Sequence, residues 1–270
     1  YSRKACEIPR TFDSRRSVTW VPTTTAPITC RSPPRVVQIG VTASMTIANT
    51  IRTIDSRNVV GRIAGSDPKL KDEYVIFSAH WDHFGIGALV NGDRIYHGAL
   101  DNATGIGGMI EIARAYAKLP VAPKRSLLFL AVTAEEQGLL GSDYYARTPL
   151  YPLRKTLAVI NMDALNIYGK TRDLSVVGLG NSDLDDYARD AAAGQGRHLV
   201  PDPKPEDGGY FRSDHFPFAK QGVPAINAGG GEEVIGKPAG WARKGHDAYT
   251  PQHYHKPSDI MRPHWDMGAA

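Results

Sequence analysis

Short apolar runs that alternate with helical patterns are the feature that most restricts the fold of this chain. Residues 74–80 (YVIFSAH), 126–132 (SLLFLAV) and 157–163 (LAVINMD) are predicted as buried strands, and residues 101–119 as a helix between the first two. Nearly continuous apolar strands separated by helices are typical of a mainly parallel sheet that is covered on both faces. We therefore expect an α/β fold, with a mixed, mainly parallel central sheet between layers of helices.

Further segments extend this pattern toward both ends of the chain. Residues 58–65, 174–180 and 222–227 are predicted as strands, and residues 139–147 and 182–193 as helices. Asn181 or Ser182 is expected to be the N-cap of the second of these helices. Residues 1–57 show little periodicity, so we expect an irregular N-terminal segment over 1–57 and one sheet-based domain over 58–270.

The composition narrows the class of protein. Hydrophobic residues make up 41% and charged residues 22%, which fits a globular domain rather than a disordered chain. The formal net charge is +4, but Lys and Arg are scattered, so no nucleic-acid partner is expected. No run of eighteen apolar residues predicts a membrane span.

The compartment is predicted only weakly by the sequence. The chain begins at Tyr1 rather than Met, which is consistent with removal of an export signal, and we expect a secreted or periplasmic protein. Its two cysteines, Cys6 and Cys30, could form a disulfide in an oxidising compartment, although spacing alone leaves their pairing open.

Three predicted core strands run directly into side chains that bind metals. These side chains are His80, the pair Glu135 and Glu136, and Asp163. Ligands of open α/β sheets lie beyond the carboxyl ends of the strands, so we expect the four side chains to converge there. Asp101, in the loop GALDNATG before a predicted helix, could reach the same crevice.

The local motifs indicate metal and proton chemistry. In AHWDH, His80 can bind zinc while Asp82 accepts the other ring N–H, and His83 is expected beside a ligand or facing solvent. In TAEEQG, two adjacent carboxylates repel each other unless a cation or a shared proton compensates. One of Glu135 and Glu136 can therefore bind metal while the other accepts a proton from water.

Two other motifs carry histidines. HYHKPSD places His253, His255 and Asp259 in a polar loop that could add a metal ligand. Residues 213–215 (SDH) invite comparison with a serine-hydrolase triad, but three consecutive residues cannot converge as a triad must, and no G-x-S-x-G motif is present. We therefore do not expect a serine hydrolase.

Together these motifs resemble a known family. They occur in the order found in the di-zinc aminopeptidases, a family that includes bacterial leucyl aminopeptidases and has glutamate carboxypeptidase and glutaminyl cyclase as distant relatives. The motifs that carry the resemblance are AHWDH, GALDNATG, AVTAEEQGLLGS, INMD, SDHFPFAKQGVPA and YHKPSD. The resemblance covers residues 58–265. In larger relatives a protease-associated domain precedes the catalytic part, and residues 1–57 could be a remnant of one.

The resemblance implies a role for each candidate residue and two zinc ions as cofactors. Glu135 would be the general base toward a metal-bridging water, Asp82 would orient His80, and Tyr254 would hydrogen-bond the developing oxyanion. The Asp101–Asn102 peptide is expected to be cis. The zinc ligands would be His80 and Asp163 for one ion and Glu136 and His255 for the other, with Asp101 bridging them.

The implied activity is a zinc-dependent aminopeptidase that removes N-terminal residues from peptides. A carboxypeptidase or a glutaminyl cyclase on the same scaffold remains an alternative. A carboxypeptidase would need a cationic pocket, which Arg243 or Lys244 could supply. A non-catalytic, receptor-like module is a further alternative, but it should have lost ligands or the base, and all five ligands and Glu135 are present.

Overall fold

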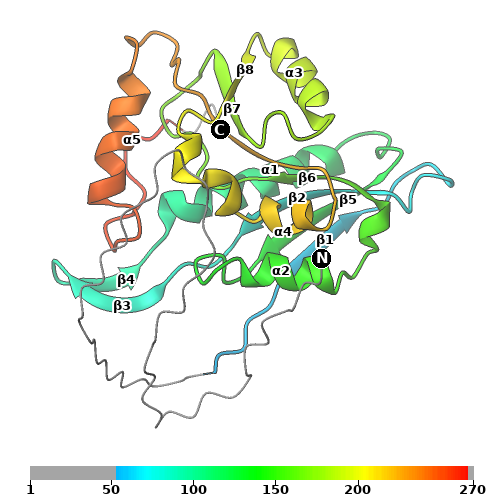
Figure 1. The fold of residues 1–270 in the computed structure, drawn as a ribbon, viewed down its shortest axis with the longest axis horizontal. Helices are drawn as coiled ribbons and strands as arrows, with labels where there is room; N and C mark the ends of the chain where they lie inside the picture. Colours follow the sequence, from blue (N-terminus) through cyan, green and yellow to red (C-terminus); the bar gives the residue numbers. More distant parts are fainter. Residues whose placement is uncertain (1–52, 267–270) are drawn as a thin grey trace, which may run out of the picture. The chain divides into compact units, whose positions relative to one another are not determined.

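The computed structural model describes residues 53–266, and its centre is a seven-stranded sheet (Figure 1). The strand order is β1-β5-β2-β6-β9-β7-β8. Strands β5, β2, β6 and β9 run parallel, whereas β1 pairs antiparallel with β5 and β7 pairs antiparallel with β9. The bounds are β1 Val59–Ile63, β2 Tyr74–His80, β5 Ser126–Val132, β6 Thr156–Asn161, β7 Asp173–Val177, β8 His198–Pro201 and β9 Ala225–Gly230.

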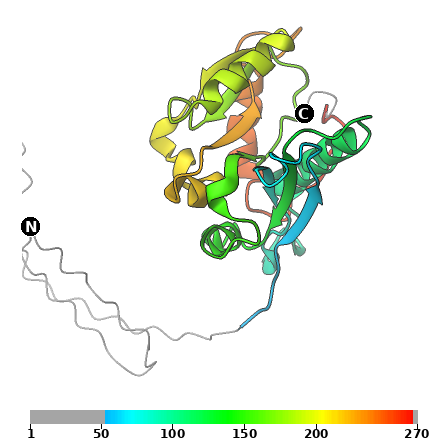
Figure 2. The same ribbon diagram turned by 90° about the vertical axis from the view of Figure 1, so that its right-hand side faces the viewer.

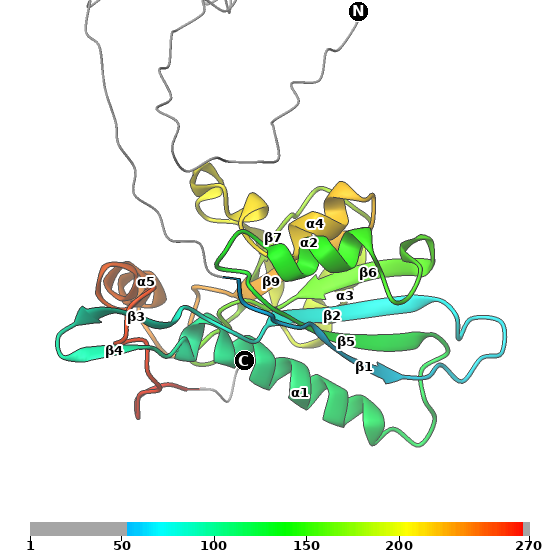
Figure 3. The same ribbon diagram turned by 90° about the horizontal axis from the view of Figure 1, so that it is seen from below.

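Helices cover both faces of this sheet. Figure 3 shows α1 on one face and α2 and α4 on the other. Figure 2 shows α3 at the end of the sheet away from β1, where it packs beside β8. The α-helices are α1 Thr104–Ala117, α2 Leu140–Arg147, α3 Leu184–Gly194, α4 His215–Lys220 and α5 Trp241–Gln252, with short helical turns at Ala99–Ala103, Leu153–Lys155, Pro205–Asp207 and Gly209–Phe211.

Strand β5 shows why the apolar runs are continuous. Leu128 and Leu130 pack into a cluster with Phe218 of α4, and Leu127 and Phe129 pack into a second cluster on the face that α1 covers. Successive side chains of a strand point to opposite faces, so a strand buried on both faces needs apolar residues at every position. The predicted α/β fold with a mixed, mainly parallel sheet is thereby confirmed.

Several elements were not predicted from the sequence. The hairpin β3 (Gly85–Val90) and β4 (Asp93–Tyr96) turns at Asn91 and Gly92, whose φ angles are +50° and +87°. An Asn-Gly pair between two strands is a strong sequence signal for a hairpin with two positive φ angles. Strand β8 and helices α4 and α5 were also missed, and α3 has Asp183 as its N-cap, not Asn181 or Ser182.

Other predictions lie mostly outside the described residues. The predicted irregular N-terminal segment, residues 1–57, lies almost entirely outside them. The open question of whether Cys6 and Cys30 pair concerns two residues that both lie outside them. Among the helices of residues 53–266, none is both long and apolar enough to cross a membrane.

Candidate active site

The five predicted metal ligands meet beyond the carboxyl ends of the central strands. His80 is the last residue of β2, Glu136 lies in the turn after β5, and Asp163 follows β6 by two residues. Asp101 lies in the turn before α1, and His255 follows α5. Adjacent parallel strands bring distant parts of the chain to one edge, as the sequence predicts.

Asp101 lies between two groups of side chains. Its Oδ1 atom is 3.1 Å from Nε2 of His80, which is also 3.4 Å from Oδ1 of Asp163. Its Oδ2 atom is 3.4 Å from Nε2 of His255, which is also 2.9 Å from Oε2 of Glu136. Each oxygen of Asp101 therefore faces a different histidine and carboxylate pair.

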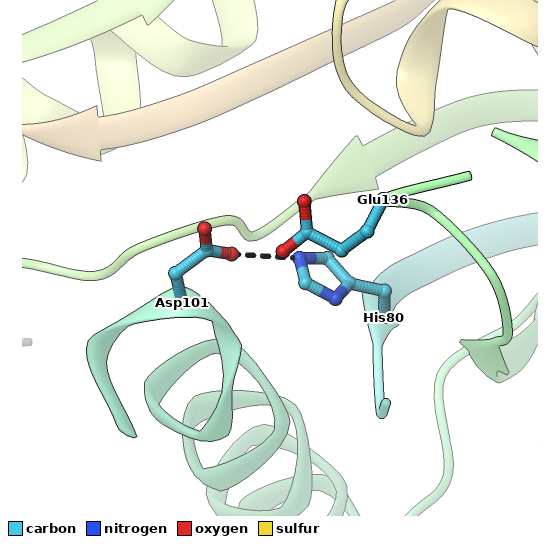
Figure 4. A group of neighbouring side chains, drawn as sticks. All are labelled: His80, Asp101 and Glu136. Atoms are coloured by element: carbon cyan, nitrogen blue, oxygen red, sulfur yellow. Dashed lines mark ion pairs between the residues drawn. The ribbon is translucent and has the colours of Figure 1, made fainter. Parts of the chain in front are cut away.

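The donor set fits a divalent cation such as zinc. Ligand atoms of His80, Asp101 and Glu136 lie within 4.8 Å of one another (Figure 4). Within the described part of the chain, Nε2 of His80, Nε2 of His255 and Oε1 of Glu136 are buried and make no hydrogen bond of good geometry. Zinc binds imidazole nitrogen and carboxylate oxygen, and buried charges of this kind are costly unless paired or coordinating.

The negatively charged carboxylates of the cluster favour a positive charge among them. Burial alone would lower the pKa of His80, but the carboxylates of Asp101 and Asp163, in contact with its Nε2, outweigh burial and raise that pKa to about 12. Burial would raise the pKa of Asp101, yet its contacts with the imidazoles of His255 and His80 hold that pKa well below its usual range. The carboxylates thus stabilise a cation at the position that the two imidazoles face.

Glu135 lies beside the cluster and differs from Glu136. Its side chain is buried, and burial, reinforced by the negative charges of Asp163 and Asp214, raises its pKa to about 9. At neutral pH such a carboxyl group would hold a proton, and a cation in the neighbouring cluster would favour its ionised, proton-accepting form. Glu136 instead contacts His255 and, through Oε1, Nδ1 of His83 at 2.6 Å.

Asp82 contacts His80 differently from the prediction. Its main-chain carbonyl, not its carboxylate, lies 2.9 Å from Nδ1 of His80. The carboxylate accepts hydrogen bonds from Ala134 N–H, at 2.8 Å, and from the hydroxyl of Thr133. The carboxylate therefore fixes the turn that carries the two glutamates, because residues 133 and 134 directly precede them.

The loop of Asp101 is held from two sides. The Asp101–Asn102 peptide is cis, as predicted. The buried carboxylate of Asp259 accepts the main-chain N–H of Asp101 at 3.2 Å. Asn102 donates to the carbonyl of Met162 at 2.9 Å and accepts the N–H of Ala164 at 3.1 Å. Asn102 therefore links this loop to the residues on either side of Asp163.

Three of the five described non-glycine residues with positive φ lie next to the site. They are Ala134 (+54°), Ala164 (+56°) and His255 (+56°). Left-handed backbone is uncommon for such residues and tends to persist where the surrounding structure holds it, often at functional sites. This backbone pattern supports the same location independently of the side chains.

Residues 213–215 do not form a triad. Ser213 donates to Oδ2 of Asp163 at 2.6 Å, whereas Asp214 accepts a hydrogen bond from Ser142 at 2.5 Å. His215 is fully buried, and its ring contacts that of Tyr210. Ser213 was not predicted to contact a ligand, and only the structure reveals that role.

The remaining candidates near His255 have distinct positions. The ring of Tyr254 stacks on that of His255, with centroids 3.7 Å apart. Burial and the charges of Asp101 and Glu136 raise the pKa of Tyr254, so its hydroxyl stays protonated and can donate. His253 lies outside the cluster and contacts Ser258 and Arg262.

Known proteins similar to this chain include aminopeptidases. The chain is 29% identical over 213 residues to a probable leucine aminopeptidase 2 of Aspergillus fumigatus, an alignment that covers 74% of this chain and 38% of that protein. It is 32% identical over 130 residues to the mouse aminopeptidase NAALADL1, covering 46% of this chain and 16% of that protein. The chain thus spans well under two thirds of the length of these relatives.

Solved structures show the same fold. A zinc aminopeptidase from Bacillus subtilis matches with a TM-score of 0.55 and 26% identity, over 78% of this chain and 45% of that one. A glutaminyl cyclase from Porphyromonas gingivalis matches with a TM-score of 0.53 and 20% identity, over 78% of this chain and 72% of that one. The family model described as "Peptidase family M28" matches residues 58–268. Because this match covers most of the chain, the chain belongs to peptidase family M28.

Proposed function

We propose that this member of the family is a zinc-dependent aminopeptidase that hydrolyses the first peptide bond of its substrate. The observation that carries the proposal is the position of Asp101, whose two oxygens each face a different histidine and carboxylate pair. The names of its relatives, which include a zinc aminopeptidase and a probable leucine aminopeptidase, point the same way.

The proposed ligands are two sets that share one carboxylate. His80 and Asp163 would hold one zinc ion, Glu136 and His255 the other, and Asp101 both. When bound, the ions would act as Lewis acids that polarise the scissile carbonyl and lower the pKa of the attacking water.

The chain's own residues would move the proton and stabilise the developing charge. Glu135 would accept the proton of the attacking water and return it to the leaving amine. Tyr254, whose hydroxyl stays protonated, would donate a hydrogen bond to the oxyanion. Ser213 would hold Asp163 by its hydrogen bond to Oδ2, leaving Oδ1 turned toward His80.

Removal of the metal is expected to abolish hydrolysis. The gently purified protein should contain about two zinc ions per chain by elemental analysis. A strong chelator should remove both the metal and the activity against aminoacyl chromogenic substrates, and added zinc should restore them. Absence of metal together with activity that survives chelation would disprove the proposed chemistry.

Blocking the substrate's N-terminus is expected to abolish turnover. The cluster of carboxylates suits a substrate ammonium group, and an acetylated amine carries no charge. A cleaved peptide and its acetylated form should be compared by mass spectrometry of the products. Equal cleavage of both forms would replace the aminopeptidase proposal with an endopeptidase or a carboxypeptidase.

One observation favours carboxypeptidase as the second candidate. The guanidinium of Arg243 is paired with Glu232, at 2.5 Å and 3.2 Å, so it is a poor receptor for a substrate carboxylate. Arg212, however, is exposed and close enough to Tyr254 and His255 for its positive charge to oppose the overall rise in their pKa values. Amidation of the peptide's C-terminus should therefore abolish cleavage under this alternative and leave it unaffected under the first.

A further inference from the structure

One cavity is lined by residues that neighbour the proposed ligands in the chain. It has a volume of about 570 Å³, within the range of ligand pockets. Ala164, which follows Asp163 directly, lines it, and so does Thr250 of α5, the helix that precedes Tyr254 and His255. A larger cavity of about 750 Å³ lies between α3 and the sheet. Neither cavity is lined by a predicted site residue itself, but only the smaller of these two is lined by a direct neighbour of a proposed ligand, Ala164.

We infer that the smaller cavity receives the side chain of the substrate's first residue and selects a long cationic one, of the lysine or arginine type. This inference rests on the proposed aminopeptidase function. A substrate whose first peptide bond lies at the metal ligands must place the side chain beside that bond in a neighbouring space. Among the cavities described above, this one adjoins a ligand.

The charge of the lining favours a cation. Six carboxylate groups face two fully charged basic groups there, an excess of four negative charges. Burial lowers the pKa of His246, another lining residue, so it adds no charge at neutral pH. The carboxylates belong to Asp173, Asp202, Asp207, Glu232, Glu233 and Asp247.

The two basic residues of the lining already have partners. Arg243 pairs with Glu232, and Lys204 lies 3.4 Å from Asp247. Among residues 53–266, Asp202 and Asp207 form no ion pair with a lysine or arginine within 4.0 Å. Of the other two, Asp173 accepts the main-chain N–H groups of Glu232 and Glu233, and Glu233 lies 3.8 Å from His198. Asp207 and Asp202, whose Oδ1 accepts the N–H of Lys204 at 2.9 Å, are therefore the carboxylates left to pair with a cationic substrate.

The rest of the wall suits the stem of such a side chain. Val200, Pro201 and Pro203 line the cavity together with the backbone of Gly229 and Gly230. Lysine and arginine place their methylene groups along apolar surface while the charged end reaches polar groups. A short side chain would leave the carboxylates unpaired, and an acidic one would be repelled by them.

The test compares two aminoacyl chromogenic substrates that match in length and differ in charge, lysyl and norleucyl. The holoenzyme is expected to have the higher kcat/KM for the lysyl substrate. In the double variant Asp202→Asn/Asp207→Asn the lysyl-to-norleucyl ratio should fall by about three- to tenfold, the size expected for partly exposed ion pairs. Added salt should lower the ratio as well.

The control variant is Asp72→Asn/Asp190→Asn, which removes two exposed carboxylates that do not line the cavity. It should leave the ratio unchanged. An equal or higher kcat/KM for the norleucyl substrate, or a ratio that falls equally in both double variants, would overturn the inference alone. No hydrolysis of either substrate would overturn the proposed aminopeptidase function and the inference with it.

Discussion

The variant Glu135→Gln is expected to fold and to bind zinc like the parent protein while kcat falls by about 10²–10⁴-fold. Glutamine keeps the size and shape of the side chain but lacks the basic oxygen that would accept a proton. Glu135 is buried beside the cluster, whereas its neighbour Glu136 makes the contacts to His255 and His83. Loss of activity without loss of metal is therefore the signature of the proposed base.

Glu136→Gln is the matched control, since it makes the same change one residue further along the same turn. It should weaken one metal site, because Oε2 of Glu136 lies 2.9 Å from Nε2 of the proposed ligand His255. Metal content and kcat should be measured on both variants. If Glu135→Gln loses metal and Glu136→Gln retains it, the two roles are reversed, and if neither loses activity, the proposed site is wrong.

The part of the fold that positions the site could be predicted from the sequence. Strands β2, β5 and β6 are buried on both faces, so their residues form apolar runs, and each run leads into a candidate ligand. The convergence of His80, Glu136 and Asp163 follows from the parallel order of these strands. Backbone direction alone determines which ends meet.

The elements that were missed have weaker local signals. Helix α4 has only six residues, fewer than the two turns that a helical apolar pattern needs to become visible. Helix α5 contains Pro251, a residue that disfavours a helix prediction. Only Ala242 of this helix is buried, so the helix needs no stripe of apolar residues that the sequence could reveal. The positions of both helices depend on tertiary contacts that no local pattern records.

Contacts around the ligands were predicted least well. The sequence places Asp82 two residues from His80, but which of its oxygens reaches the ring depends on the path of the chain, and the carbonyl takes that position. Ser213 lies 50 residues from Asp163 in the chain, so their hydrogen bond leaves no local trace. Residue types predict ligands, whereas the hydrogen bonds that hold the ligands require the fold.

Asp101→Ala is expected to lose more metal than the removal of any other single ligand. The two oxygens of Asp101 face the two opposite halves of the cluster, at 3.1 Å from His80 and 3.4 Å from His255. Both zinc sites would therefore lose a ligand, while His255→Ala should weaken one. Activity should fall below measurement in Asp101→Ala even when zinc is added at concentrations that restore the parent protein.

The comparison between these two variants separates a bridging role from a role at one site. The main-chain N–H of Asp101 still reaches Asp259 when its side chain is removed, so the loop keeps this anchor and circular dichroism should show an unchanged fold. Zinc titration should then reveal two weakened sites in Asp101→Ala and one in His255→Ala. Equal zinc retention by the two variants would contradict the proposal that Asp101 bridges the ions, because removal of a ligand shared by both ions must weaken both sites.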